Sequence, residues 1–231
     1  MRMRIASLSL LTICCLILAV APAMAQNRDL YDNGPFNGTT DAWTINFGFT
    51  VSDSYILDPN HSVNDFHFVY WDASSTDILT SVDWCTSGAP LCTPNATWGA
   101  GGAGTVSNVF LTSNQFGYFL YQADITGLPD LHFGSNPGFI TLGNACTTSG
   151  CSVSNPIYWD ENDGVGCGGL DGGGTNCPSI AYNDSVGSVG SEVFTITGTT
   201  GAGTTPEPSS IMLFGSGILG LAGVLRHKLN I

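Results

Sequence analysis

The end of the chain carries an apolar span that is unsuited to water. Residues 209–225 hold no charge, and the basic residues Arg226 and Lys228 follow them. A helix of roughly 17–25 apolar residues crosses the hydrocarbon core of a bilayer, and positive flanks stay on the cytoplasmic side. A helix of a soluble core is the alternative, but such a helix would show a polar face. The span predicts a C-terminal single transmembrane helix, with the preceding chain outside the cell membrane.

The beginning of the chain has the features of an export signal. Arg2 and Arg4 precede an apolar run over residues 5–20, and Ala23 and Ala25 form a small-x-small cleavage site. This order is typical of a secretory signal peptide over 1–25 that signal peptidase removes, so the mature chain begins at Gln26. An uncleaved signal anchor is the alternative. Only residues 26–205 must then fold in water.

The mature segment is strongly acidic. Arg28 is the only Lys or Arg between residues 26 and 205, and the whole chain has a formal net charge of −13. Such a surface repels nucleic acid and anionic lipid headgroups, whereas it favours solubility and divalent cations. We therefore expect no nucleic-acid partner.

Six cysteines remain after the signal peptide, and they lie as three near neighbours in sequence. An even number in an exported chain indicates disulfides, because that compartment is oxidising. Metal ligation by thiolates is disfavoured, since no C-x-x-C spacing occurs. Among 15 connectivities, we favour the three local pairs Cys85–Cys92, Cys146–Cys151 and Cys167–Cys177.

Alternating apolar and polar residues dominate the mature segment. The pattern is strict over 43–51, where one face of the predicted strand holds Trp43, Ile45, Phe47 and Phe49. Apolar residues on both faces of 63–71 predict a central strand. Further strands are predicted over 78–84, 105–111, 117–125, 138–142, 156–159 and 192–197, with long loops over 85–104 and 160–178. The pattern predicts an all-β ectodomain over 26–198, an antiparallel β-sandwich or jelly roll, and then a Gly/Thr linker over 199–205.

The last 26 residues combine a short motif, an apolar span and a basic end in fixed order. Pro206, Glu207 and Pro208, followed by the span and Arg226, resemble the PEP-CTERM sorting signal of exported bacterial proteins, here over 206–231. The resemblance implies processing by an exosortase in a bacterium with an outer membrane and an exopolysaccharide. It also implies a transient stage in the inner membrane, and then the cell surface or extracellular matrix.

The ectodomain itself is similar only to uncharacterised proteins with this signal. The residues that carry the similarity lie in three stretches, 30–35, 158–162 and 192–196. This similarity implies no activity.

One polar stretch suggests a cation site. Asp160, Asn162 and Asp163 precede a glycine, as in the first half of a calcium loop. Calcium takes six to eight oxygens, so distant acids or carbonyls would have to complete the site. The alternative is an acidic surface loop. Calcium is the one cofactor that the sequence suggests.

Three tryptophans next to predicted loops, Trp84, Trp98 and Trp159, are candidates for stacking on sugar rings. Packing beneath the disulfides is the alternative for them. Trp43 and Trp71 are assigned to the core.

These observations favour a non-catalytic, exported surface or matrix protein that is associated with polysaccharide. One alternative is a secreted glycan-active hydrolase that uses two carboxylates, although the common hydrolase motifs G-x-S-x-G and H-E-x-x-H are missing. Another is a purely structural or adhesive surface protein.

Overall fold

The structure is a computed structural model that describes residues 27–129, 131, 133, 137–151, 155–162, 168–171, 179–200 and 217. All of these except Gly217 belong to one compact unit, Gln26–Gly201. Within these ranges, no helix has the length and apolar character needed to cross a membrane. The signal peptide, the sorting motif and, except for Gly217, the apolar span lie outside the described residues. So do Ala23, Ala25, Gln26, Pro206, Glu207, Pro208, Arg226 and Lys228.

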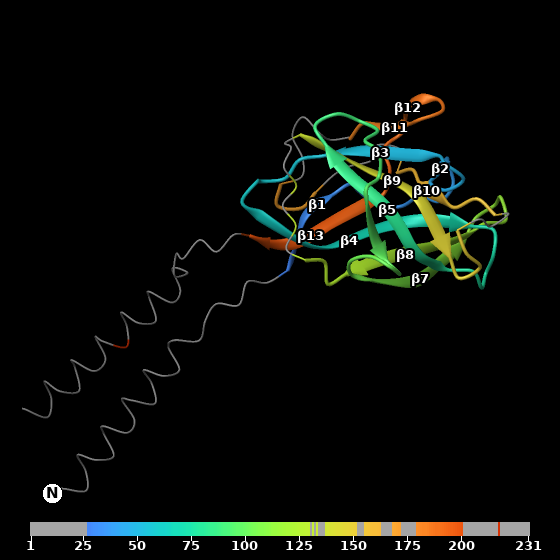
Figure 1. The fold of residues 1–231 in the computed structure, drawn as a ribbon, viewed down its shortest axis with the longest axis horizontal. Helices are drawn as coiled ribbons and strands as arrows, with labels where there is room; N and C mark the ends of the chain where they lie inside the picture. The colour runs from blue at the N-terminus through green and yellow to red at the C-terminus, as the bar shows by residue number, and fades with distance from the viewer. Residues whose placement is uncertain are drawn as a thin grey trace, which may run out of the picture. The chain divides into compact units, whose positions relative to one another are not determined.

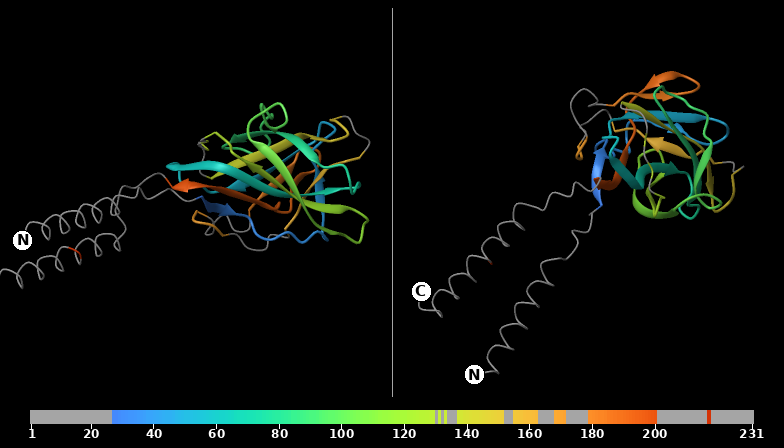
Figure 2. Two further views of the ribbon diagram at one scale, coloured as in Figure 1. Left: turned by 90° about the horizontal axis from the view of Figure 1, so that it is seen from below. Right: turned by 60° about the vertical axis from the view of Figure 1, so that its left-hand side comes forward.

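Two antiparallel sheets pack face to face, which confirms the predicted all-β sandwich (Figures 1 and 2). The seven-stranded sheet contains β1 (Arg28–Asp32), β2 (Ala42–Thr44), β4 (His61–Asp72), β7 (Thr105–Ser113), β8 (Phe119–Thr126), β10 (Tyr158–Asp160) and β13 (Phe194–Thr200). The six-stranded sheet runs in the order β12 (Gly187–Val189), β11 (Ala181–Asn183), β3 (Thr50–Tyr55), β9 (Gly138–Thr147), β5 (Leu79–Ser87) and β6 (Ala96–Gly99).

The strand β4 is central, as its two apolar faces predict. It pairs with β13 and then β10 along one side, and with β8 along the other. β7 pairs with β8, whereas β1 and β2 pair with β13 and β10. Because neighbours in each sheet are often distant in sequence, the fold depends on long-range pairing.

Aromatic rings from both sheets fill the core. Phe66 of β4 lies 4.9 Å from Trp98 of β6 and 5.7 Å from Phe194 of β13, as measured between ring centroids. All three side chains are buried. Each large apolar side chain removed from water in this way stabilises the fold by about 1.5–3 kcal/mol.

The predicted strand over 43–51 is wrong, because two strands of different sheets share this stretch. β2 ends at Thr44 in one sheet, and β3 begins at Thr50 in the other. Between them the Phe49 N–H donates to the Asn46 carbonyl at 3.0 Å, and Phe47 and Gly48 adopt positive φ angles of 57° and 86°. The buried Asn46 side chain also bonds to the backbone of Asn155 and Ile157, so tertiary contacts hold this turn.

Other boundaries also differ from the predictions. The predicted loop over 85–104 contains β6, and the short strands β1, β11 and β12 were not predicted. β13 continues to Thr200 because Thr199 and Thr200 pair with Ser62 and His61 of β4. The predicted linker over 199–205 therefore begins two residues too early.

The disulfides Cys85–Cys92 and Cys146–Cys151 are present, with Cα–Cα distances of 6.2 and 4.1 Å. They confirm two of the three predicted local pairs. Cys167 and Cys177 lie outside the described residues.

We expect the double substitution Cys85→Ser/Cys92→Ser to lower the free energy of unfolding by about 2.5 kcal/mol. This is the stabilisation expected when a crosslink closes so short a loop in the unfolded chain. Urea unfolding of the variant and of the wild type measures it. An unchanged midpoint with an unchanged slope would contradict the expectation.

Candidate functional site

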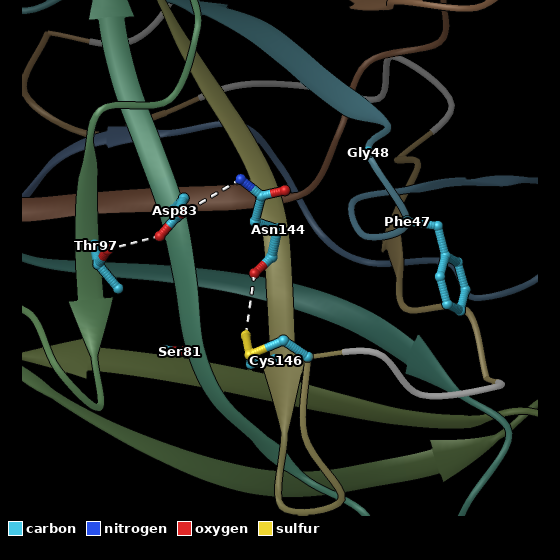
Figure 3. Close-up of a pocket in the computed structure, with 8 residues that line it drawn as sticks. Phe47, Gly48, Ser81, Asp83, Thr97, Asn144 and Cys146 are labelled. Atoms are coloured by element: carbon cyan, nitrogen blue, oxygen red, sulfur yellow. Dashed lines mark hydrogen bonds between the residues drawn. A yellow bond between two sulfur atoms is a disulfide. The ribbon is translucent and has the colours of Figure 1, made fainter.

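A groove of about 690 Å³ lies on the outer face of the six-stranded sheet. Val82 of β5 and Ala145 of β9 point into the core, so their neighbours along each strand face outward. The groove is lined by Phe47, Gly48, Ser81, Asp83, Thr97, Asn144, Cys146 and Cys151 (Figure 3). Its volume is in the range of 300–1,000 Å³ that is usual for ligand pockets.

Three polar side chains form a row across the floor of the groove. Asp83 of β5 accepts a hydrogen bond from the Thr97 hydroxyl of β6 at 2.6 Å. Its other oxygen accepts from Nδ2 of Asn144 of β9 at 3.0 Å. Figure 3 shows Asp83 between these two partners. Both carboxylate oxygens are thus held in place, and the row presents donors and acceptors at fixed positions.

A β-bulge places Asn144 in this row. The β5–β9 register shifts between Ser81 and Asp83, so that Asn144 and Ala145 lie opposite the single residue Val82. Asn144 has a φ of 47°, in the left-handed region that Asn tolerates better than most residues. Bulges commonly re-aim side chains next to functional sites.

Phe47 stands at the other side of the groove, beyond β9 (Figure 3). Its φ of 57° is unfavourable for a bulky residue, and its side chain is 48% exposed. Packing therefore compensates little of the backbone strain, which costs on the order of 1–3 kcal/mol. Leu91 is the third described non-glycine residue with positive φ, and it lies elsewhere, so two of the three line this groove.

The predicted sugar-stacking tryptophans lie elsewhere, and this prediction is wrong for Trp98 and Trp159. Both are fully buried, because β6 and β10 carry them into the core. Trp84 is half-buried and stacks on Trp98 at 4.4 Å between ring centroids. The indole Nε1 of Trp159 donates to the Val193 carbonyl at 2.8 Å. These rings stabilise the core and offer no face to a ligand, except for the partly exposed Trp84.

Two of the three proposed calcium residues, Asp160 and Asn162, are buried and do not lie in a surface loop. Asp160 ends β10 with no exposed surface, and its Oδ1 accepts from the Trp71 indole at 2.5 Å. Asn162 is also buried and donates to the Asn33 and Glu192 carbonyls. Asp163 lies outside the described residues. In the part of the chain that the structure describes, no group of three or more His, Cys, Asp or Glu side chains is arranged to hold a metal ion.

The stretch around Asp160 instead belongs to a buried acidic cluster, which we define as Asp53, Asp160, Glu161 and Glu192. Glu161 and Glu192 form an isolated antiparallel bridge. Oε1 of Glu161 accepts from Nε1 of Trp43 at 2.6 Å and from the Gly190 N–H at 3.1 Å. Both carboxyl oxygens of Glu192 are buried and have no hydrogen-bond partner.

Burial governs the protonation of this cluster. Removal from water raises the pKa of both Asp53 and Asp160 to about 7. The hydrogen bonds that each carboxyl group accepts lower its pKa, but burial has the larger effect. Burial also raises the pKa of Glu192 well above its ordinary value, and the nearby charges of Asp53, Glu161, Asp160 and Asp41 raise it further. Glu192, a buried carboxyl without a partner, therefore favours its neutral form near neutral pH, whereas Asp53 and Asp160 titrate in that range.

The sequence alone did not predict the groove or the buried acidic cluster. The signal for Phe47 was present, since Asn46 and Gly48 on either side of it are typical turn residues. The strict alternation of 43–51 outweighed that signal. The row of Asp83, Thr97 and Asn144 comes from three strands, and no spacing along the chain relates them.

Comparison with known proteins finds a match in the C-terminal segment. Residues 204–226 match the PEP-CTERM protein-sorting motif, which confirms the resemblance of the C-terminal segment. No curated protein and no solved structure matches the chain. The motif indicates that an exosortase sorts this protein to the cell surface.

Proposed function

We propose that this exported protein is a non-catalytic surface protein that binds a neutral polysaccharide in the groove around Asp83. Signal peptidase and exosortase release it from the inner membrane in this proposal, so that the ectodomain acts at the cell surface or in the matrix. The observation that carries the proposal is Phe47, an exposed aromatic ring in a strained turn at the side of a polar groove.

The groove combines the two kinds of group that bind a sugar. An aromatic ring offers a flat apolar face to the C–H face of a pyranose, and Phe47 supplies such a ring. Sugar hydroxyls can form hydrogen bonds with the carboxylate of Asp83 and with the side-chain amide of Asn144. Hydrogen bonds to a carboxylate are stronger than those between neutral groups. The ectodomain is strongly acidic, since Arg28 is the only Lys or Arg of residues 26–205, and this disfavours an anionic polymer. We therefore propose a neutral one.

The groove supports binding better than hydrolysis. Glycoside hydrolysis ordinarily requires two carboxyl groups on opposite sides of the scissile bond. Among the described residues that line the groove, Asp83 is the only carboxylate. Glu161 and Glu192, which form a bridge in the buried acidic cluster, are only 6% and 0% exposed and are out of reach of a polymer.

We expect Phe47→Ala to weaken binding of a neutral exopolysaccharide by about tenfold, which corresponds to about 1.4 kcal/mol. The stability of the fold should change little, because half of the side chain is already exposed. Calorimetric titration of the exported protein with polysaccharide from the producing strain measures the affinity. A reducing-sugar assay on the same mixtures should show no turnover.

The matched control is Phe36→Ala, since Phe36 is 39% exposed and does not line the groove. This variant should bind as the wild type does. Equal affinity of all three proteins would contradict the assignment of the groove, and turnover would replace the binding role with a catalytic one.

A further inference from the structure

The strand β7 is a free edge of the seven-stranded sheet. It pairs with β8 along Thr105–Ser113, and no other strand in the described ranges pairs with its second side. Most of its residues are exposed. The register with β8 shifts between Phe110 and Thr112, so the regular part of the edge is the stretch from Thr105 to Phe110. A free edge of this kind presents unpaired N–H and C=O groups to another chain.

This edge has few of the devices that usually prevent pairing. Natural edge strands are commonly protected by charged side chains or proline, and β7 contains neither. No charged residue occurs anywhere in residues 84–123. Val109, Phe110 and Phe116 are 49%, 56% and 55% exposed, so the uncharged edge is also apolar.

An apolar groove lies beside the edge. It measures about 480 Å³ and is lined mainly by Ile78 of the chain before β5, Phe110 of β7, and Phe119 and Tyr121 of β8, together with Ser75 and Thr76. A side chain from a strand added to β7 would find an apolar surface there.

The charge distribution identifies the occupant as a second copy of this chain. Two copies of this ectodomain, in which Arg28 is the only Lys or Arg of residues 26–205, repel each other over their acidic surfaces. That repulsion is smallest where both copies present the uncharged edge. A two-fold axis brings the same edge from each molecule together, and its groups are then self-complementary. A basic partner would instead prefer the acidic faces. We propose that two copies pair through their β7 strands, in antiparallel orientation, and form one continuous sheet across a dimer.

Sedimentation equilibrium of the exported protein over a concentration series tests this proposal. We expect the wild type to reach twice the mass of one chain. Val109→Asp places a negative charge on each side of the two-fold axis and should raise the dimer dissociation constant at least about tenfold.

The matched control is Val186→Asp. Val186 is 59% exposed in the turn between β11 and β12, on the opposite side of the sandwich from β7 (Figure 1). The Val186→Asp substitution adds the same charge as Val109→Asp does, but it should leave the dimer dissociation constant unchanged. A monomeric wild type at the highest concentration would overturn the proposal. So would a Val109→Asp protein that dimerises as the wild type does, or equal weakening by both variants.

Discussion

Replacing Asn33 by alanine is expected to lower the free energy of unfolding by about 3 kcal/mol or more, the largest effect of any single substitution considered. Asn33 is fully buried after β1, and its Nδ2 lies 3.0 Å from Asp53 Oδ2, 2.7 Å from Ser179 Oγ and 2.9 Å from Ser191 Oγ. Its Oδ1 accepts from the Tyr31 hydroxyl at 2.9 Å. Alanine would remove the two N–H donors and the acceptor oxygen that make these buried contacts. A net hydrogen bond is worth about 0.5–1.5 kcal/mol, or about 1.5–3 kcal/mol when one partner is charged.

The position of Asn33 explains why this loss should be large. It follows β1 of the seven-stranded sheet, whereas Asp53 belongs to β3 of the six-stranded sheet. The Asn33–Asp53 bond therefore ties the two layers together inside the core. The control is Asn27→Ala, because Asn27 is exposed and makes one bond to Asp65 at 2.9 Å. It should change stability by no more than about 0.5 kcal/mol. A loss below about 1 kcal/mol for Asn33→Ala in urea unfolding would contradict this account.

The protein is expected to be more stable in mild acid than in mild base, by roughly 5 kcal/mol between pH 5 and pH 8. Asp53 and Asp160 have pKa values of about 7 in the fold because of burial, against 3.8 for the ordinary group. Between these values the folded protein binds more protons than the unfolded chain does. Stability from these two groups is complete below about pH 4 and is lost as the pH rises through about 7.

Asp160→Asn separates this effect from the general repulsion of an acidic protein. Oδ1 of Asp160 accepts from Trp71, and Oδ2 is buried without a partner. Asparagine can keep the first contact without titrating, so the variant should lose the part of the pH dependence that Asp160 contributes. Asp184→Asn removes an exposed carboxylate from the β11–β12 turn and should keep it. Urea unfolding at pH 5 and pH 8 measures all three proteins, and an identical difference for Asp160→Asn and the wild type would contradict the explanation.

Much of the fold could be predicted from local patterns. The stretch 63–71 is apolar on both faces, and β4 is indeed a central strand that pairs on both sides. Cys85 and Cys92 form the expected bridge because two cysteines so close in sequence meet wherever their loop folds. The stretch 43–51 could not be divided into two strands on its pattern, because its alternation continues unbroken across the turn at Asn46 and Gly48.

The candidate site residues could be predicted from the sequence much less well than the strands, because their surroundings depend on the tertiary structure. Trp98 and Trp159 are next to polar, glycine-rich stretches in sequence, yet strand pairing turns both rings into the core. Asp160 has the sequence context of a surface loop and is fully buried. In each case the surroundings of a side chain are made by residues far away in the chain.

The sequence by itself determined the destination of this protein. The sorting motif over 204–226 is a continuous segment, which a processing enzyme can recognise without reference to the fold. The sequence also determined the all-β class, since alternation with period two is a property of neighbouring residues. Only the tertiary structure decided which acids are buried and which polar groups line the groove. Asp83, Thr97 and Asn144 meet because three strands pair side by side, and Phe47 joins them because a turn between the two sheets holds it there.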